Sequence, residues 1–170
     1  TRVPEKSRRP IVNKAWRQSL QEYPVQGDYY KQVREGMVRV HKRGESLDAL
    51  ADVVSRVHHD KQPHVARVVK AYIQWCEGHV LEFFPARKGY WQAHGVDVRV
   101  NPELGLVIDG IPHLIKVNFT KSPVPVAEAR IMTHLMHRVL AAQVPANCVM
   151  AVLDLATGTL YGSTRPSPAL

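Results

Sequence analysis

Cysteine is scarce in this chain of 170 residues, and long apolar runs are missing. The two cysteines, Cys76 and Cys148, have the apolar neighbours typical of small core residues, so neither a disulfide scaffold nor a cysteine-rich zinc module is expected. The longest apolar stretch, residues 147–153, is strand-sized and far shorter than the ~18 apolar residues of a membrane span. No apolar segment follows the basic residues 1–10, so no signal peptide is recognised. These absences predict a cytoplasmic protein without a membrane partner.

Acidic side chains are also outnumbered, because 23 Lys and Arg stand against 15 Asp and Glu, a net charge of +8. The excess is concentrated in residues 1–45, which hold 11 of the basic residues and 5 of the acidic ones. Such asymmetry predicts a nucleic-acid partner, bound through phosphate contacts and counterion release. A solvated basic surface is the alternative. The predicted nucleic-acid contacts are Arg8, Arg9, Lys14, Arg17, Arg39, Lys42, Arg43, Arg87 and Lys88.

The patterns along the chain divide it into four segments. Residues 1–26 are rich in proline, arginine and glutamine, which predicts a basic extended arm. Helical spacing over 27–62 predicts a helical leader. An α+β core domain is expected over 63–161, where helical and alternating patterns follow one another. The proline, glycine and serine content of 162–170 predicts a disordered tail.

Start and stop signals locate three helices at the beginning of this order. Asp28 suits the N-cap of a helix that ends at Gly44, and Ser46 can cap a second helix over 47–57. A third helix is expected over roughly 63–79, with a proline in its first turn.

After Gly95 the apolar residues recur every two residues instead of every 3.6, which indicates strands. The expected elements are strands at 96–100, 104–109 and 113–119, a helix at 126–140, and strands at 148–155 and 159–161. The predicted fold class is α+β, with a helical N-terminal leader and a mixed-sheet core of order helix-strand-strand-strand-helix-strand.

The hairpin of 104–109 and 113–119 is expected to bring polar residues onto one face. If the apolar residues of both strands face one core, even positions of the first strand pair with odd positions of the second, which requires an even loop length. Lys116 is then expected opposite Gly105 or Val107, within reach of Asp109 and on the same face as Glu103. A three-residue loop would undo this register.

A carboxylate on one strand and a lysine on the next suit phosphodiester hydrolysis. Carboxylates hold Mg²⁺ or Mn²⁺, and a lysine can position or activate the attacking water. Glu77 and Glu82, expected at the end of the preceding helix, would add further carboxylates. An exposed sheet face with a salt bridge is the alternative interpretation of the same residues.

The order of helix, three-strand meander, helix and strand resembles the core of the PD-(D/E)XK nuclease superfamily over roughly residues 64–155. Residues 105–109 and 114–116 are similar to the aspartate strand and the lysine strand of its RecB-like and restriction-enzyme-like members. The resemblance implies a restriction-endonuclease-like fold, with Asp109 as the metal-binding aspartate and Lys116 as the motif lysine.

The resemblance also implies that Glu77 or Glu82 is the extra carboxylate of the preceding helix. The acidic position two residues before the lysine is, however, Leu114 in this chain. This departure implies either a catalytically impaired domain or a migrated ligand such as Glu103.

Two functions therefore remain open from the sequence. The first is a Mg²⁺- or Mn²⁺-dependent nuclease, or an impaired relative, with Asp109, Lys116 and Glu103 as catalytic residues. Its metal ligands would be Asp109, Glu103 and Glu77 or Glu82. The alternative is a non-catalytic nucleic-acid-binding or protein-assembly module that uses the sheet face as an interface.

Two further groups of residues have two interpretations each. The group of His58, His59, Asp60 and His64, and the pair His134 and His137, could hold zinc or iron. Without an HExxH pattern or a cysteine pair, a surface or helix-end role is expected instead. The aromatic residues Trp75, Phe83, Phe84, Tyr90 and Trp91 are expected in the core, or else as a base-stacking platform beside Arg87 and Lys88.

Overall fold

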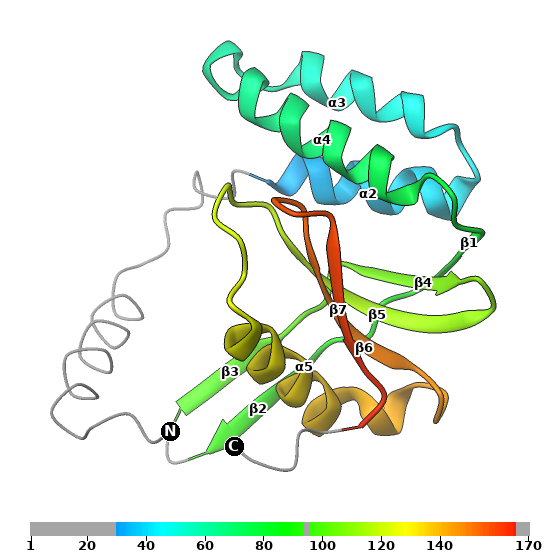
Figure 1. Cartoon of the computed structure of the whole chain (residues 1–170), viewed down its shortest axis with the longest axis vertical. Helices are drawn as coiled ribbons and strands as arrows, with labels where there is room; N and C mark the ends of the chain where they lie inside the picture. The colour runs from blue at the N-terminus through cyan, green and yellow to red at the C-terminus, as the bar shows by residue number, and fades with distance from the viewer. Residues whose placement is uncertain (1–29, 94–95, 166–170) are drawn as a thin grey trace, which may run out of the picture.

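The computed structural model describes residues 30–93 and 96–165. Over these residues a mixed five-stranded sheet lies between a layer of helices and a second layer that contains one long helix and a two-stranded sheet (Figure 1). The predicted α+β class with a mixed sheet is confirmed. The predicted arm at 1–26, together with Asp28, lies outside the described residues, as do residues 166–170 of the predicted tail.

The first layer begins with helices that carry the expected start and stop signals. α2 (Lys31–Arg43) ends at Gly44, which has a φ of 63°. The Ser46 side chain caps η2 (Leu47–Leu50), a 3₁₀ turn that continues directly into α3 (Ala51–Arg56).

α4 completes this layer and is shorter than predicted. A 3₁₀ turn, η3 (His59–Lys61), joins α3 to α4 (Gln62–Cys76), which has Pro63 in its first turn as expected. The helix ends early because a glycine with a φ of 85° follows within two residues. Glu77 therefore follows the helix, and Glu82 lies in the next strand instead of on the helix.

The large sheet has the strand order β1-β4-β5-β6-β7. Its strands are β1 (Leu81–Phe84), β4 (Leu104–Ile108), β5 (Ile111–Asn118), β6 (Val149–Asp154) and β7 (Thr159–Ser163). β5 and β6 are parallel, and the other neighbouring strands are antiparallel. α5 (Val126–Leu140), followed by η4 (Ala141–Gln143), supplies the long connection that parallel pairing requires.

The predicted meander, in which the strand at 96–100 neighbours the strand at 104–109, is wrong. That strand, β3 (Val96–Val100), pairs with β2 (Gly89–Ala93) in a separate two-stranded sheet, and β1 takes the place beside β4. β1 and β2 are not among the predicted strands, because their aromatic-rich sequence lacks a clear alternation of apolar and polar residues. β7 also continues to Ser163, beyond its predicted end.

Alternate residues of the central strands point to opposite faces of the sheet, and each face packs against its own hydrophobic core. Leu104 and Ile115 face the core beneath α2, α3 and α4, whereas Leu114 faces the core beneath α5. Cys76 is buried in the first core and Cys148 in the second, and both are free thiols. The prediction that they are core residues and form no disulfide is confirmed.

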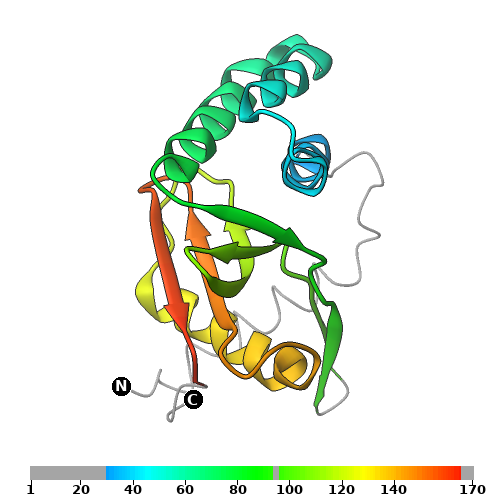
Figure 2. The same cartoon turned by 90° about the vertical axis from the view of Figure 1, so that its right-hand side faces the viewer.

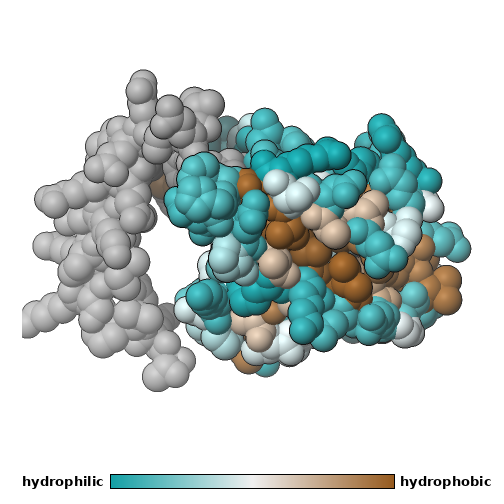
Figure 3. Space-filling view, turned by 90° about the horizontal axis from the view of Figure 1, so that it is seen from above, coloured by the Kyte–Doolittle hydropathy of each residue, from teal (hydrophilic) through white to brown (hydrophobic). Residues whose placement is uncertain are grey.

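The outer face of the helical layer is mainly hydrophilic, with a patch of hydrophobic surface between the hydrophilic side chains (Figure 3). In the part of the chain that the structure describes, none of the helices combines the length and the hydropathy needed to cross a membrane.

Candidate functional site

The β4–β5 hairpin closes earlier in the chain than predicted. Its two-residue turn, Asp109–Gly110, has φ values of 50° and 85°, the left-handed conformations of a type I′ turn, for which Asp-Gly is a favoured pair. Even positions of β4 pair with odd positions of β5, as predicted. The ladder is nevertheless shifted, and Lys116 lies opposite Glu103 rather than opposite Gly105 or Val107.

Asp109 and Lys116 therefore do not share a site. Lys116 lies at the opposite end of the hairpin, about 20 Å away at roughly 3.3 Å per strand residue. The Asp109 carboxylate accepts a hydrogen bond from Val80 N at 2.9 Å and lies 2.9 Å from His79 Nδ1. The bond from Val80, and then the one from His79, hold the pKa of Asp109 below its usual value. Asp109 thus fastens the turn after α4 to the hairpin turn.

Glu103 and Lys116 do meet, at the start of β4. Lys116 Nζ lies 2.6 Å from one Glu103 carboxylate oxygen, and Val117 N donates to the other oxygen at 2.7 Å. Only 6% of the Glu103 side chain is exposed, compared with 35% of the Lys116 side chain. Because β4 begins here, the Glu103 carboxylate satisfies a β5 backbone N–H that would otherwise lack a partner.

Replacing Glu103 with alanine is expected to lower the free energy of unfolding by about 2 kcal/mol, because Val117 N loses its acceptor and Lys116 keeps only the longer bond of 3.4 Å to the Asn101 carbonyl. Glu103→Gln keeps one acceptor oxygen, so its free energy of unfolding should fall by less. Glu82→Ala, at an exposed position of β1, is the control, with an expected change within about 0.5 kcal/mol. Urea unfolding measures all three variants. A Glu103→Ala protein as stable as the wild type would contradict this structural role.

The residues around Lys116 do not fit a Mg²⁺ or Mn²⁺ centre. These ions take several oxygen ligands, whereas Leu114 is fully buried in the core beneath α5 and offers none. Both oxygens of Glu103 are engaged by hydrogen bonds within the protein. Glu77 follows α4, and Glu82 lies on the edge strand β1, separated from β5 by β4. The predicted metal ligands therefore do not converge.

A cavity of about 670 Å³ lies between α2 and the segment that leads from β1 to β2. α2 packs against β1, and the two elements are seen beside each other in Figure 2. Residues three, four and seven apart share one face of a helix, so basic residues of α2 form one wall of this groove. The lining residues are Lys31, Arg34, Glu35, Val38, Arg39, Lys42, Arg43, Phe83, Pro85, Ala86, Lys88, Asn101, Pro102 and Glu103.

The groove has an excess of positive charge, because its lining includes six basic and two acidic side chains. Within the part of the chain that the structure describes, Lys42 and Lys88 form no ion pair with a carboxylate. Arg43 lies 3.5 Å from Glu45 and is 68% exposed. Arg39 is instead held by Glu45 at 3.2 Å and has a structural role. Lys42, Lys88 and the exposed Arg43 are therefore cations of the groove that an anionic ligand can reach.

The structure brings together four of the predicted nucleic-acid contacts, Arg39, Lys42, Arg43 and Lys88, in this groove. Arg87 is exposed beside them in the same segment. Lys31 and Arg34 also line the groove and are missing from the prediction, although their helical spacing relative to Lys42 was readable. The predicted contacts Arg8, Arg9, Lys14 and Arg17 lie outside the described residues.

The aromatic residues are divided between core and surface. Trp75 packs against the core beneath the helical layer, and Phe84 and Trp91 pack against the core beneath α5, as expected of core residues. Phe83 lines the groove, and Tyr90 is 63% exposed on β2. Phe83 and Tyr90 are therefore the two whose position suits contact with a base.

One histidine of the pair on α5 has a structural contact. His137 is buried, and its Nε2 lies 2.9 Å from the carbonyl oxygen of Ser163 in β7. Neither His134 nor His137 belongs to a group of three metal-ligating side chains among residues 30–93 and 96–165. His137 thus occupies a helix-end position, in the last turn of α5, but it is buried instead of lying on the surface.

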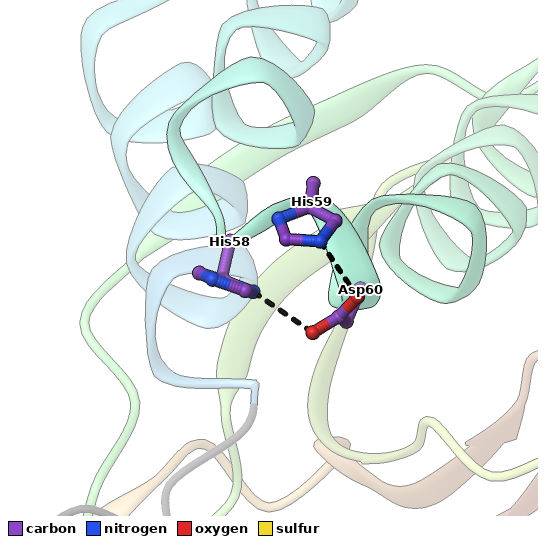
Figure 4. Close-up of side chains that lie close together, drawn as sticks. All are labelled: His58, His59 and Asp60. Carbon is purple, nitrogen blue, oxygen red and sulfur yellow. Dashed lines mark ion pairs between the residues drawn. The ribbon is translucent and has the colours of Figure 1, made fainter.

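The other histidine group is smaller than the sequence suggested. His58, His59 and Asp60 converge at the junction between α3 and α4 (Figure 4). His64 instead contacts the Tyr30 hydroxyl through its Nε2. The ligand atoms of His58, His59 and Asp60 lie within 4.8 Å of one another. This is the one such group of three in the described ranges.

No protein-family model matches this chain, and neither the curated proteins nor the solved structures contain a significant match to it.

Proposed function

We propose that this chain is a nucleic-acid-binding domain that holds a single strand in the groove between α2 and residues 85–88. One observation carries the proposal, namely that Lys42 and Lys88, which pair with no carboxylate of the described residues, line the same cavity as Phe83. Cations bind the phosphate backbone, and aromatic faces stack with unpaired bases. A duplex keeps its base faces stacked inside, so the apolar lining favours a single strand.

The exposed face of the β2–β3 hairpin supports a longer binding surface. Tyr90 pairs directly with Arg99, and β2 begins immediately after Lys88. Arg99 forms no ion pair with a carboxylate of the described residues. An exposed tyrosine beside an arginine is suited to stacking with a base. We infer that the strand passes from α2 across Lys88 to Tyr90.

The order of α4, three antiparallel strands, α5 and a parallel strand supports a relation to restriction-endonuclease-like nucleases. Within that proposed relation, Glu103 is the acid beside Lys116. Hydrolysis is not part of the proposal, because Leu114 and the hydrogen-bonded Glu103 leave too few oxygen ligands for Mg²⁺ or Mn²⁺. We propose a binding domain of nuclease-like fold, with a cytoplasmic location in keeping with its two free thiols.

Fluorescence anisotropy tests the proposal with labelled single-stranded DNA, single-stranded RNA and duplex DNA of about 16 nucleotides. Titrations at about 50 and 200 mM salt, with EDTA or with Mn²⁺, should show salt-sensitive binding that prefers single strands and needs no metal. Equal or tighter binding to the duplex would contradict the single-strand assignment. Mn²⁺-dependent cutting that Glu103→Ala abolishes would support the nuclease alternative instead.

A further inference from the structure

A second candidate site lies away from the groove, where α3 meets α4. His58 Nδ1 is 3.2 Å from Asp60 Oδ2, and His59 Nε2 is 2.9 Å from Asp60 Oδ1. Each imidazole therefore faces a different oxygen of the same carboxylate (Figure 4). Two nitrogen donors and one carboxylate converge on a single point of the surface.

Core packing and helix capping do not explain these three side chains. Their exposed fractions are 63% for His58, 78% for His59 and 73% for Asp60, so none of them packs in a core. No side chain caps the start of η3 or of α4. Within the described ranges, the only ion-pair partner of either histidine is Asp60, and Asp60 pairs with no lysine or arginine.

The backbone beneath the three side chains is held in place. Lys61 N donates a hydrogen bond to the His58 carbonyl at 2.8 Å, and the Gln62 side chain donates to the Val57 carbonyl at 3.2 Å. Val57 is itself buried in the core beneath the helical layer. A fixed backbone reduces the conformational entropy lost when side chains gather around a ligand.

We propose that His58, His59 and Asp60 bind a Zn²⁺ ion. In a tetrahedral zinc site with bonds of about 2.0–2.1 Å, neighbouring ligand atoms lie about 3.3 Å apart. The two nitrogen–oxygen distances of 3.2 and 2.9 Å, which end on different oxygens of Asp60, are close to that separation, and the three ligand atoms all lie within 4.8 Å of one another. Imidazole nitrogens select Zn²⁺ and similar transition metals over Mg²⁺ and Ca²⁺. Three protein ligands leave the fourth position to water or to a ligand from a partner.

Isothermal titration calorimetry of the full, untagged chain with Zn²⁺ tests this site, independently of nucleic-acid binding. One ion per chain is expected, and His58→Gln or His59→Gln should each weaken binding by about tenfold or more, since each removes one of three ligands. His79→Gln is the matched control, because His79 also pairs with an aspartate at 2.9 Å but lacks a second imidazole in its ion pair.

Circular dichroism establishes that the variants remain folded, as expected for substitutions at exposed side chains. Unchanged Zn²⁺ affinity in both His58→Gln and His59→Gln would overturn the proposal. An equal loss of affinity in His79→Gln would overturn it as well, because it would indicate general binding to surface histidines.

Discussion

Reversing three charges of the groove together, Lys42→Glu, Arg43→Glu and Lys88→Glu, is expected to weaken binding to single-stranded DNA by about 100-fold at 0.1 M salt. Each phosphate contact with a single strand adds about 0.7 to the slope of log K against log salt, which is about fivefold in affinity at that concentration. The loss of three contacts should therefore also lower the slope by about 2. Anisotropy titrations over a range of salt concentrations measure both quantities.

A second triple variant controls for net charge. Lys70→Glu, Arg130→Glu and Arg138→Glu change the charge by the same amount at exposed positions of α4 and α5, outside the groove lining. This control should weaken binding only a few-fold and leave the salt slope nearly unchanged, because it alters long-range attraction and removes no contact. Equal losses in the two triple variants would show that net charge, and not the groove, determines affinity.

The largest expected effect on stability comes from Asp154, a fully buried carboxylate at the end of β6. It accepts hydrogen bonds from Asn118 Nδ2, Val124 N, Ala156 N and Thr157 Oγ1, at 3.0 to 3.1 Å. These bonds tie the ends of the parallel strands β5 and β6 to the segments that enter α5 and β7.

Asp154→Ala is expected to lower the free energy of unfolding by about 4 kcal/mol at neutral pH, because four donors lose their buried acceptor. Asp154→Asn has the same shape and keeps one acceptor oxygen, so its loss should be smaller. Asp97→Ala, at an exposed position of β3, is the control, with an expected change within about 0.5 kcal/mol. Urea unfolding followed by circular dichroism compares the three. An Asp154→Ala protein that loses no more stability than the control would contradict this role.

The free energy of unfolding below neutral pH should depend on the ionisation of the same Asp154 carboxyl group. Burial raises the pKa of Asp154, but the hydrogen bonds from Asn118, Val124, Ala156 and Thr157 together lower it below its ordinary value. A carboxyl group with a lowered pKa in the folded state stabilises the fold above its unfolded pKa of about 3.9. That stabilisation is lost as the pH falls through the folded pKa. Acidification below about pH 4 should therefore cost the wild type more stability than it costs Asp154→Asn.

Local signals in the sequence were enough to predict the helices but not the partners of every strand. Gly44, Ser46 and Pro63 act on their own neighbours, so the helix boundaries near them could be predicted. β1 joins a strand more than twenty residues away in the chain, across the inserted β2–β3 hairpin, and no local pattern encodes that pairing. The alternation of apolar and polar residues correctly predicted which side chains of the β4–β5 hairpin face the core beneath the helical layer. The register of the hairpin depended instead on the positive φ angles of Asp109–Gly110.

The groove likewise could not be predicted from local sequence signals alone. The basic spacing along α2 is visible in the sequence, but the opposite wall, which includes Phe83 and Lys88, comes from a segment some forty residues later. Only the packing of α2 against β1 brings the two walls together. The predicted proximity of Lys116 to Asp109 was wrong for a comparable reason, because the position of one turn decides whether Lys116 meets Asp109 or Glu103.

Photo-crosslinking tests most directly whether the groove binds a single strand. A single-stranded oligonucleotide that carries 5-iodouracil forms adducts with aromatic side chains in contact with its bases, and peptide mass spectrometry locates them. The account predicts adducts at Phe83 or Tyr90, which competition by unlabelled single strand removes. Adducts that occur only outside residues 81–93, under conditions where the oligonucleotide is bound, would contradict it.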